Sequence, residues 1–178
     1  MNIFYLNNNP SICAAEHCDK HIVKMCIEYA QLLSTAHRVL DGSIYTEKSK
    51  KVYVKRFSLD EPRESILYKA CHINHPSSIW VRKSKLHYEW LFNLYIECCI
   101  QYTLRYNKKH SSQRLSDCLS IIPTNIKNNK WEEPPLAMPD KYKVNNNAIQ
   151  SYRNYYIGDK VSFAKWKSSD IPSWFIVN

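Results

Sequence analysis

Polar side chains lie on a single line along the otherwise apolar segment 17–38. Seven of them recur at intervals of four and three residues: His17, His21, Lys24, Glu28, Gln31, Thr35 and Arg38. Because an α-helix has about 3.6 residues per turn, this spacing predicts a helix with one polar stripe. A surface helix normally has a narrow apolar stripe and a broad polar face. The reversed proportion here predicts a largely buried helix that turns its polar stripe toward a functional site.

The carboxylate of Glu28 is the centre of the predicted site. Lys24 lies one helical turn before it, and His21 and His17 lie on the preceding turns of the same stripe. Charged neighbours and apolar walls shift the proton affinities of such groups in opposite directions, and this coupling is frequent at functional sites. A carboxylate in this setting can hold and transfer a proton. A solvated edge of a core helix would carry the same residues, and the pattern leaves that alternative open.

The chain is strongly basic. Its 178 residues include 25 Lys and Arg against 16 Asp and Glu, which gives a formal net charge of +9. This balance favours a polyanionic partner, with nucleic acid expected before an acidic membrane surface. Only two glycines are present, Gly42 and Gly158. Glycine-rich phosphate loops and dinucleotide fingerprints are therefore excluded, and we expect no cofactor.

Sequence features also bear on the compartment. No stretch approaches the roughly 20 apolar residues of a membrane span, and the first ten residues do not resemble a secretory signal. The seven cysteines are odd in number, and several occupy apolar helical positions, as expected for reduced thiols. We expect an intracellular protein, cytoplasmic or nuclear in a eukaryotic host, with no membrane partner. The abundance of Asn, Lys and Ile is typical of AT-rich genomes and would suit a virus or an intracellular microbe.

The remaining patterns predict a mainly α fold, a compact helical bundle that forms one domain over 1–178. Helices are expected over 10–40, 65–75, 78–106, 112–119 and from 148 onward. A short strand or extended arm is expected over 2–6, a basic exposed loop or weak hairpin over 45–58, and an irregular segment rich in Pro and Asn over 121–147.

Two other groups of residues suggest functions other than acid/base catalysis. Residues of the kinds that bind zinc are present at His17, His21, Cys71, His72 and His75. Their spacing does not match a known zinc pattern. Basic and aromatic residues alternate over 152–167, which fits simple nucleic-acid binding with phosphates held by cations and bases stacked on rings. In both cases an ordinary structural role for the same residues remains open.

The pair His21 and Glu28 and the segment 152–158 (YRNYYIG) resemble the phage-type pyrimidine-dimer DNA glycosylases, the endonuclease V repair family. Members of that family are small, basic, all-helical enzymes. Their first helix carries a His and, seven residues later, the catalytic Glu, and they end in an aromatic-rich segment. The resemblance implies a DNA glycosylase/lyase with Glu28 as its acid/base group. It also implies contacts to the damaged strand from Gln31, His37 and Arg38.

The nucleophile is where this chain departs from that family. The family uses the free amine of a processed amino terminus, which forms a Schiff base with C1′ of the deoxyribose. Here Met1 is followed by Asn2, a residue whose size opposes removal of the initiator methionine. The attacking amine is then that of Met1 itself or of Lys24 or Lys20, or the scaffold carries a different chemistry.

These observations together predict a DNA glycosylase/lyase or a related base-modifying enzyme. The predicted catalytic residues are Glu28, Lys24, His21, His17 and Met1. The residues predicted to contact nucleic acid are Gln31, His37, Arg38, Trp80, Arg82, Lys83, Arg153 and Tyr155. Trp80 or Tyr155 would hold an extruded base, and the basic side chains would bind phosphates. The alternatives are a non-catalytic nucleic-acid-binding accessory protein and a zinc-dependent enzyme that acts on nucleotides.

Overall fold

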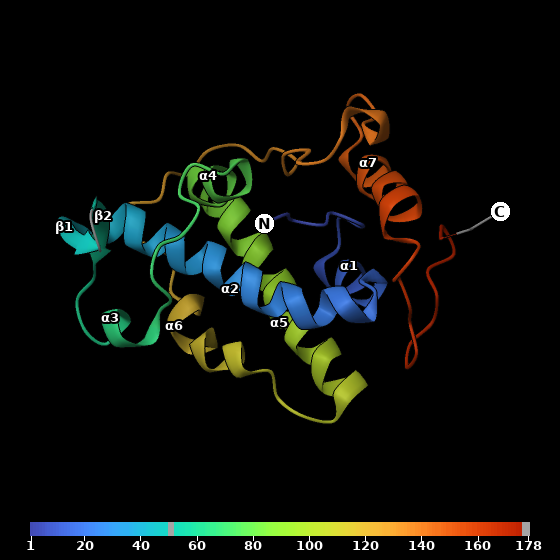
Figure 1. Cartoon of the computed structure of the whole chain (residues 1–178), viewed down its shortest axis with the longest axis horizontal. Helices are drawn as coiled ribbons and strands as arrows, with labels where there is room; N and C mark the ends of the chain where they lie inside the picture. The colour runs from blue at the N-terminus through green and yellow to red at the C-terminus, as the bar shows by residue number, and fades with distance from the viewer. Residues whose placement is uncertain (50–51, 176–178) are drawn as a thin grey trace.

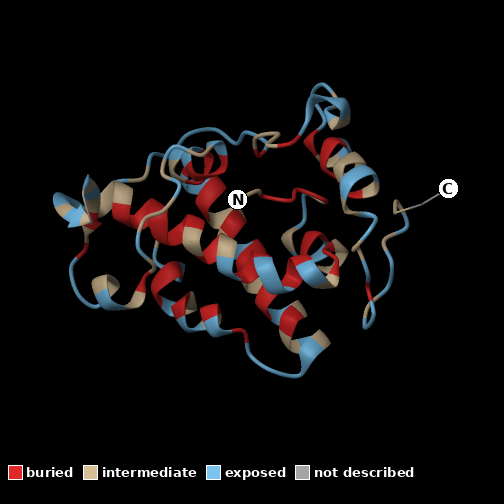
Figure 2. Ribbon diagram, in the orientation of Figure 1, coloured by how far each residue is buried: buried red, intermediate tan, exposed pale blue. Residues whose placement is uncertain are grey.

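Two long helices form the centre of the fold (Figure 1). In the computed structural model, which describes residues 1–49 and 52–175, α2 spans Asp19–Asp41 and α5 spans Lys85–Tyr106. The two helices pack against each other, and buried side chains line their shared side (Figure 2). The protein is mainly α, as predicted, although a small hairpin at one end of α2 means that it is not a pure helical bundle.

The remaining elements are short. The helices are α1 (Pro10–Glu16), α3 (Arg63–Ile66), α4 (Pro76–Lys83), α6 (Ser116–Ser120) and α7 (Ala148–Tyr155). Two 3₁₀ helices, η1 (Ser111–Leu115) and η2 (Asp140–Tyr142), and one π-helical turn, η3 (Tyr156–Lys160), complete the helical set. The hairpin consists of β1 (Ser43–Ser49) paired antiparallel with β2 (Val52–Ser58).

The predicted helix over 10–40 is divided into α1 and α2. The backbone is extended at His17 and Cys18, where ψ is 134° and 162°. Arg105, which lies near the end of α5, donates hydrogen bonds to the carbonyl oxygens of Ala15 and His17 at 2.9 and 2.8 Å. These carbonyls would accept intrahelical bonds in a continuous helix. A side chain from a distant segment therefore compensates for the break.

The predicted helix over 65–75 is wrong. Only α3 forms in this region, and Leu67 is already extended. The carbonyl oxygens of Leu67 and Tyr68 accept hydrogen bonds from the buried guanidinium of Arg38 at 2.9 and 2.7 Å. Backbone carbonyls that would have completed a helix instead accept hydrogen bonds from a buried cation, whose charge is balanced by Glu64.

The predicted helix over 78–106 is divided at Ser84, whose backbone is extended and whose hydroxyl accepts a hydrogen bond from the amide of Leu86. The other predictions of secondary structure are confirmed more closely. The segment 112–119 is helical as η1 and α6, the last helix starts at Ala148, and 121–147 is irregular apart from η2. Of the basic segment 45–58, the parts 45–49 and 52–58 form paired strands rather than a loop, and residues 50–51 lie outside the described residues.

The segment 2–6 is an extended arm rather than a strand. Ile3, Phe4, Tyr5 and Leu6 are all buried, and the arm enters the middle of the molecule (Figure 1). The side chain of Asn2 donates a hydrogen bond to the carbonyl of Ala137 at 2.9 Å. The start of the chain is thereby fixed against the core.

The cysteines and the character of the helices complete the description of the fold. Across the described residues all seven cysteines are free thiols, and six of them are buried. A search of the same residues finds no helix with the length and apolar character that a bilayer crossing requires.

Gly42, directly after α2, has no room for a side chain. A Cβ atom there would lie 2.4 Å from the carbonyl oxygen of Arg38 and 2.8 Å from that of Ser58, and both atoms belong to the backbone. We expect Gly42→Ala to lower the free energy of unfolding by about 1–3 kcal/mol, because the hairpin must move away from α2. Urea unfolding measures this, with Ser43→Ala as the exposed neighbouring control. Equal stability of the two variants would contradict the prediction.

Candidate active site

A cavity of about 340 Å³ is lined by residues of the amino-terminal arm, of α2, of the end of α7 and of the segment that follows α7. Its lining residues are Met1, Asn2, Phe4, Lys20, His21, Lys24, Glu28, Tyr155, Lys160 and Phe163. The structure thus brings together six of the residues singled out in the sequence: Met1, Lys20, His21, Lys24, Glu28 and Tyr155. The polar stripe lines a concave site over the first half of α2.

Glu28 is the only carboxylate among the residues that line this cavity. Its side chain is 15% exposed, and an oxygen of its carboxylate lies 3.3 Å from Nζ of Lys24, one turn earlier on α2. The Lys24 side chain is 64% exposed, so water screens this ion pair. The carboxylate is therefore sheltered by its surroundings and still accessible from the cavity.

The amino terminus and Glu28 are electrostatically close to the same two side chains. Burial raises the pKa of the Cys71 thiol, the Glu28 carboxylate raises it further, and the charged amino terminus lowers it. Burial and the amino terminus lower the pKa of His75, and Glu28 opposes them. The charges of the Met1 amine and the Glu28 carboxylate thus both affect the pKa values of Cys71 and His75, in agreement with the cavity that the two groups share.

His21 forms a wall of the cavity as a neutral ring. It is 5% exposed, its ring stacks on Phe4 with centroids 4.2 Å apart, and its Nδ1 is hydrogen-bonded to the hydroxyl of Tyr156. Burial, followed by the charges of His17, Lys160 and Lys24, lowers the pKa of His21 to about 2. The imidazole is therefore uncharged at physiological pH and positions the cavity wall rather than binding anions.

His17 lies outside the cavity lining. It is completely buried, with Nδ1 2.6 Å from the carbonyl oxygen of Cys13 and Nε2 2.9 Å from the hydroxyl of Tyr29. Burial lowers its pKa to about 4. Both ring nitrogens are used within the core, so the structure gives His17 a role in connecting α1 to α2 instead of the predicted support of Glu28.

Aromatic rings and lysines form another part of the cavity lining. Nζ of Lys160 lies 4.2 Å from the centroid of the Tyr155 ring and donates a hydrogen bond to its hydroxyl at 2.9 Å. Nζ of Lys20 lies 5.0 Å from the centroid of the Phe163 ring. Cations beside flat apolar faces suit a ligand that combines negative charge with a planar ring.

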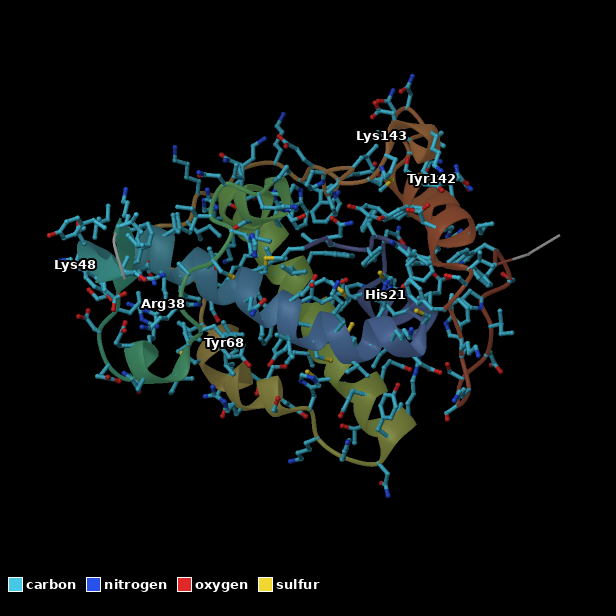
Figure 3. All side chains as sticks on the ribbon, in the orientation of Figure 1. His21, Arg38, Lys48, Tyr68, Tyr142 and Lys143 are labelled. Carbon is cyan, nitrogen blue, oxygen red and sulfur yellow. The ribbon has the colours of Figure 1, made fainter. Side chains whose placement is uncertain are left out.

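Arg38 is a structural residue rather than a phosphate ligand. Its side chain is 2% exposed and points toward the segment that carries Tyr68 (Figure 3). It donates hydrogen bonds to the carbonyls of Phe57, Glu64, Leu67 and Tyr68 and to the Glu64 carboxylate, the last at 2.6 Å. The segment between β2 and α4 covers this guanidinium and takes up its donors, so a phosphate cannot reach it.

His37 and Trp80 are also placed in the core. Nε2 of His37 lies 2.8 Å from the hydroxyl of Tyr88. Trp80 is 5% exposed, stacks on His87 with centroids 4.3 Å apart and donates a hydrogen bond to the carbonyl of Glu132. A buried indole of this kind cannot receive an extruded base, whereas Tyr155 lines the cavity.

The other residues predicted to contact nucleic acid lie in different environments. Arg153 donates hydrogen bonds to the carbonyl of Leu6 at 3.0 Å and to the Glu16 carboxylate at 3.4 Å, which ties α7 to the amino-terminal arm. Lys83 pairs with Glu132, and Arg82 donates a hydrogen bond to the hydroxyl of Ser78 at 3.2 Å. Gln31 is partly exposed on α2. None of these four residues lines the cavity.

The zinc alternative finds no ligand set in the structure. Within residues 1–49 and 52–175, His, Cys, Asp and Glu side chains do not gather in groups of three or more that would hold a metal ion. His17 already uses both ring nitrogens, and Nδ1 of His21 contacts a tyrosine hydroxyl.

Some cavity residues are missing from the sequence prediction. Lys160 and Phe163 belong to the alternating basic and aromatic segment 152–167, whose pattern indicates only a binding surface. Phe4 and Asn2 give no signal, because nothing in the sequence shows that the arm enters the core. The periodic spacing of polar residues along α2 is the sequence signal that indicates Glu28.

Comparison with known protein families, with characterised proteins and with solved structures found no match. The geometry and chemistry of this cavity therefore carry the functional argument. They define a mainly α protein with a basic, ring-lined cavity around one carboxylate.

Buried neutral histidines make stability depend on pH. Burial lowers the pKa of His17 and of His37 to about 4, against about 6.5 in an unfolded chain. Between these values the unfolded chain binds protons that the folded chain does not. Stability is then complete above pH 6.5 and falls as the pH drops toward 4, by at most about 1.4 kcal/mol per pH unit for each histidine.

Urea unfolding at pH 7.5, 6 and 5 measures this dependence. We expect the free energy of unfolding to decrease along the series, and His17→Gln to reduce the slope. A stability that stays constant or rises toward pH 5 would contradict the neutral buried histidines.

Proposed function

We propose that this chain is a DNA glycosylase/lyase in which the α-amino group of Met1 is the nucleophile and Glu28 is the acid/base group. The observation that carries the proposal is that Met1 and Glu28 line one cavity. The formal net charge of +9 and the three lysines of the cavity wall supply attraction for a DNA strand.

The chemistry requires an amine, a carboxylate and access to C1′ of a deoxyribose. The amine attacks C1′ while the C1′–N bond to the base breaks, and the base leaves with the bonding electron pair and takes up a proton. Glu28 accepts the proton that the attacking amine loses and passes it to O4′ as the C1′–O4′ bond breaks and the sugar ring opens to an iminium cation. The carboxylate, ionised again, then stabilises that cation. Loss of a C2′ proton then expels the 3′ phosphate, and water releases the amine.

We assign the nucleophile to the α-amino group of Met1 rather than to a lysine side chain because the chain beside this amine is held in place. The buried arm fixes its direction, because Asn2 is bonded to Ala137 and the hydroxyl of Ser77 donates to the carbonyl of Met1 at 3.4 Å. Lys20, Lys24 and Lys160 are then available for phosphates.

Borohydride trapping tests the proposal. Protein whose first residue is Met1 is incubated with a duplex that contains one abasic site, and borohydride is added. We expect a covalent protein–DNA adduct, because borohydride reduces the imine to a stable amine, and strand cleavage when borohydride is left out. A duplex of the same sequence without the abasic site is the matched control.

Absence of both the adduct and the cleavage would overturn the lyase proposal. Salt-dependent binding without any product would then favour the non-catalytic accessory protein, which needs the basic cavity but no chemistry at Glu28.

A further inference from the structure

A second hollow of about 710 Å³ adjoins the cavity, and Lys20 and Phe163 line both. We propose that this second hollow binds the nucleotide next to the reacting one on the same DNA strand, with its phosphate on lysines and its base against an aromatic ring. The inference rests on the proposed function, because the shared wall makes the two sites adjacent positions along one strand.

The second hollow carries a surplus of positive charge. Lys20, Lys165 and Lys167 line it and are exposed. Its one carboxylate, Asp19, is already neutralised, since it lies 3.1 Å from the Arg105 guanidinium and accepts a hydrogen bond from a backbone amide at 2.9 Å. The three lysine ammonium groups are the charges that remain for an anionic ligand.

Apolar and aromatic groups alternate with these lysines. Phe163 lines both hollows, and the second hollow is also lined by Tyr106 and Val23, which are 38% and 41% exposed. Base stacking on aromatic rings beside a basic strip is the usual mode of single-strand binding and tolerates any base. An inorganic anion would use the lysines and leave the rings without a role.

The walls of the second hollow are held in place by hydrogen bonds. The amide of Asp19 donates to the carbonyl of Lys165 at 2.8 Å, the amide of Lys167 donates to the Asp19 carboxylate, and the indole of Trp166 donates to the carbonyl of Glu16 at 3.2 Å. The segment 162–168 is thus fastened to the start of α2. A preformed site of this kind avoids the cost of ordering a loop when the strand binds.

The test compares two double variants that remove the same charge. Lys165→Ala/Lys167→Ala alters the second hollow, and Lys127→Ala/Lys130→Ala alters exposed lysines of the irregular segment, outside both hollows. Fluorescence anisotropy gives the dissociation constant for a duplex that carries a stable abasic analogue, at several salt concentrations. Thermal unfolding checks that both variants are folded.

We expect the first double variant to bind several-fold more weakly, with a salt slope (log K against log [salt]) that is smaller by about 0.9 for each phosphate that the protein no longer neutralises. The control variant should keep the wild-type slope. Removing the flanking nucleotide from one side of the abasic analogue should weaken wild-type binding and leave the double variant unchanged.

Three results would overturn the inference. The first is a salt slope of Lys165→Ala/Lys167→Ala equal to that of the wild type. The second is an equal loss of affinity in both proteins when the flanking nucleotide is removed on either side. The third is competition for binding by a free deoxynucleotide that is as strong as competition by the strand. The trapping reaction separates the two proposals. If the protein forms the adduct but the salt slope of Lys165→Ala/Lys167→Ala is unchanged, only the inference about the second hollow is wrong. If the salt slope changes but no adduct forms, the lyase proposal is wrong and the second hollow remains a strand-binding site.

Discussion

Glu28→Gln is expected to lower the single-turnover rate of base or strand release by about 10²–10⁴-fold, the usual contribution of a positioned acid/base group. The amide keeps the size of the side chain and cannot accept the proton of the attacking amine. DNA binding should be unchanged or tighter, because a negative charge is removed from a cavity whose other charged groups are cations.

Single-turnover kinetics on the abasic duplex measures the rate of strand release, which is the step that this substrate reports, and anisotropy measures binding. Glu89→Gln is the matched control, since Glu89 is an exposed carboxylate on α5 that pairs with Lys85 at 3.8 Å and does not line the cavity. Glu28→Gln retaining a rate close to that of the control would show that Glu28 is not the acid/base group.

Arg38→Met is expected to be the most destabilising single change, with a loss of about 3–5 kcal/mol in the free energy of unfolding. The guanidinium is 2% exposed and bonds to Glu64 and to four backbone carbonyls. Methionine fills much of the space and leaves these acceptors without donors. For a chain of this length the loss corresponds to a decrease in melting temperature of roughly 6–20 °C.

Thermal and urea unfolding measure this loss, with Arg56→Met as the control. Arg56 also pairs with a glutamate, Glu47 at 2.8 Å, but its side chain is 30% exposed, so we expect a change of about 1 kcal/mol or less. Similar losses in the two variants would contradict the structural role given to Arg38.

The sequence predicted the helices better than their interruptions. Periodic apolar positions locate α2 and α5, because burial of one face imposes that spacing. The break at His17 depends on the guanidinium of Arg105, and the missing helix over 65–75 depends on Arg38. Both arginines are distant in sequence from the backbone they bind, so no local pattern contains this information.

The polar stripe was only half predictive of the site. Its first part supplies His21, Lys24 and Glu28 to the cavity, whereas Thr35 and Arg38 continue the same line and are buried under the segment that follows the hairpin. Helical spacing determines which side chains share a face. Which part of that face remains open depends on where the rest of the chain packs.

The claim that the amine of Met1 and Glu28 act on one sugar is tested most directly by locating the reduced adduct. After borohydride trapping and proteolysis, mass spectrometry identifies the peptide that carries the sugar remnant. We expect it on the α-nitrogen of Met1, and we expect no adduct when two residues precede Met1. An adduct on Lys20, Lys24 or Lys160, or full trapping by the extended chain, would contradict the assignment.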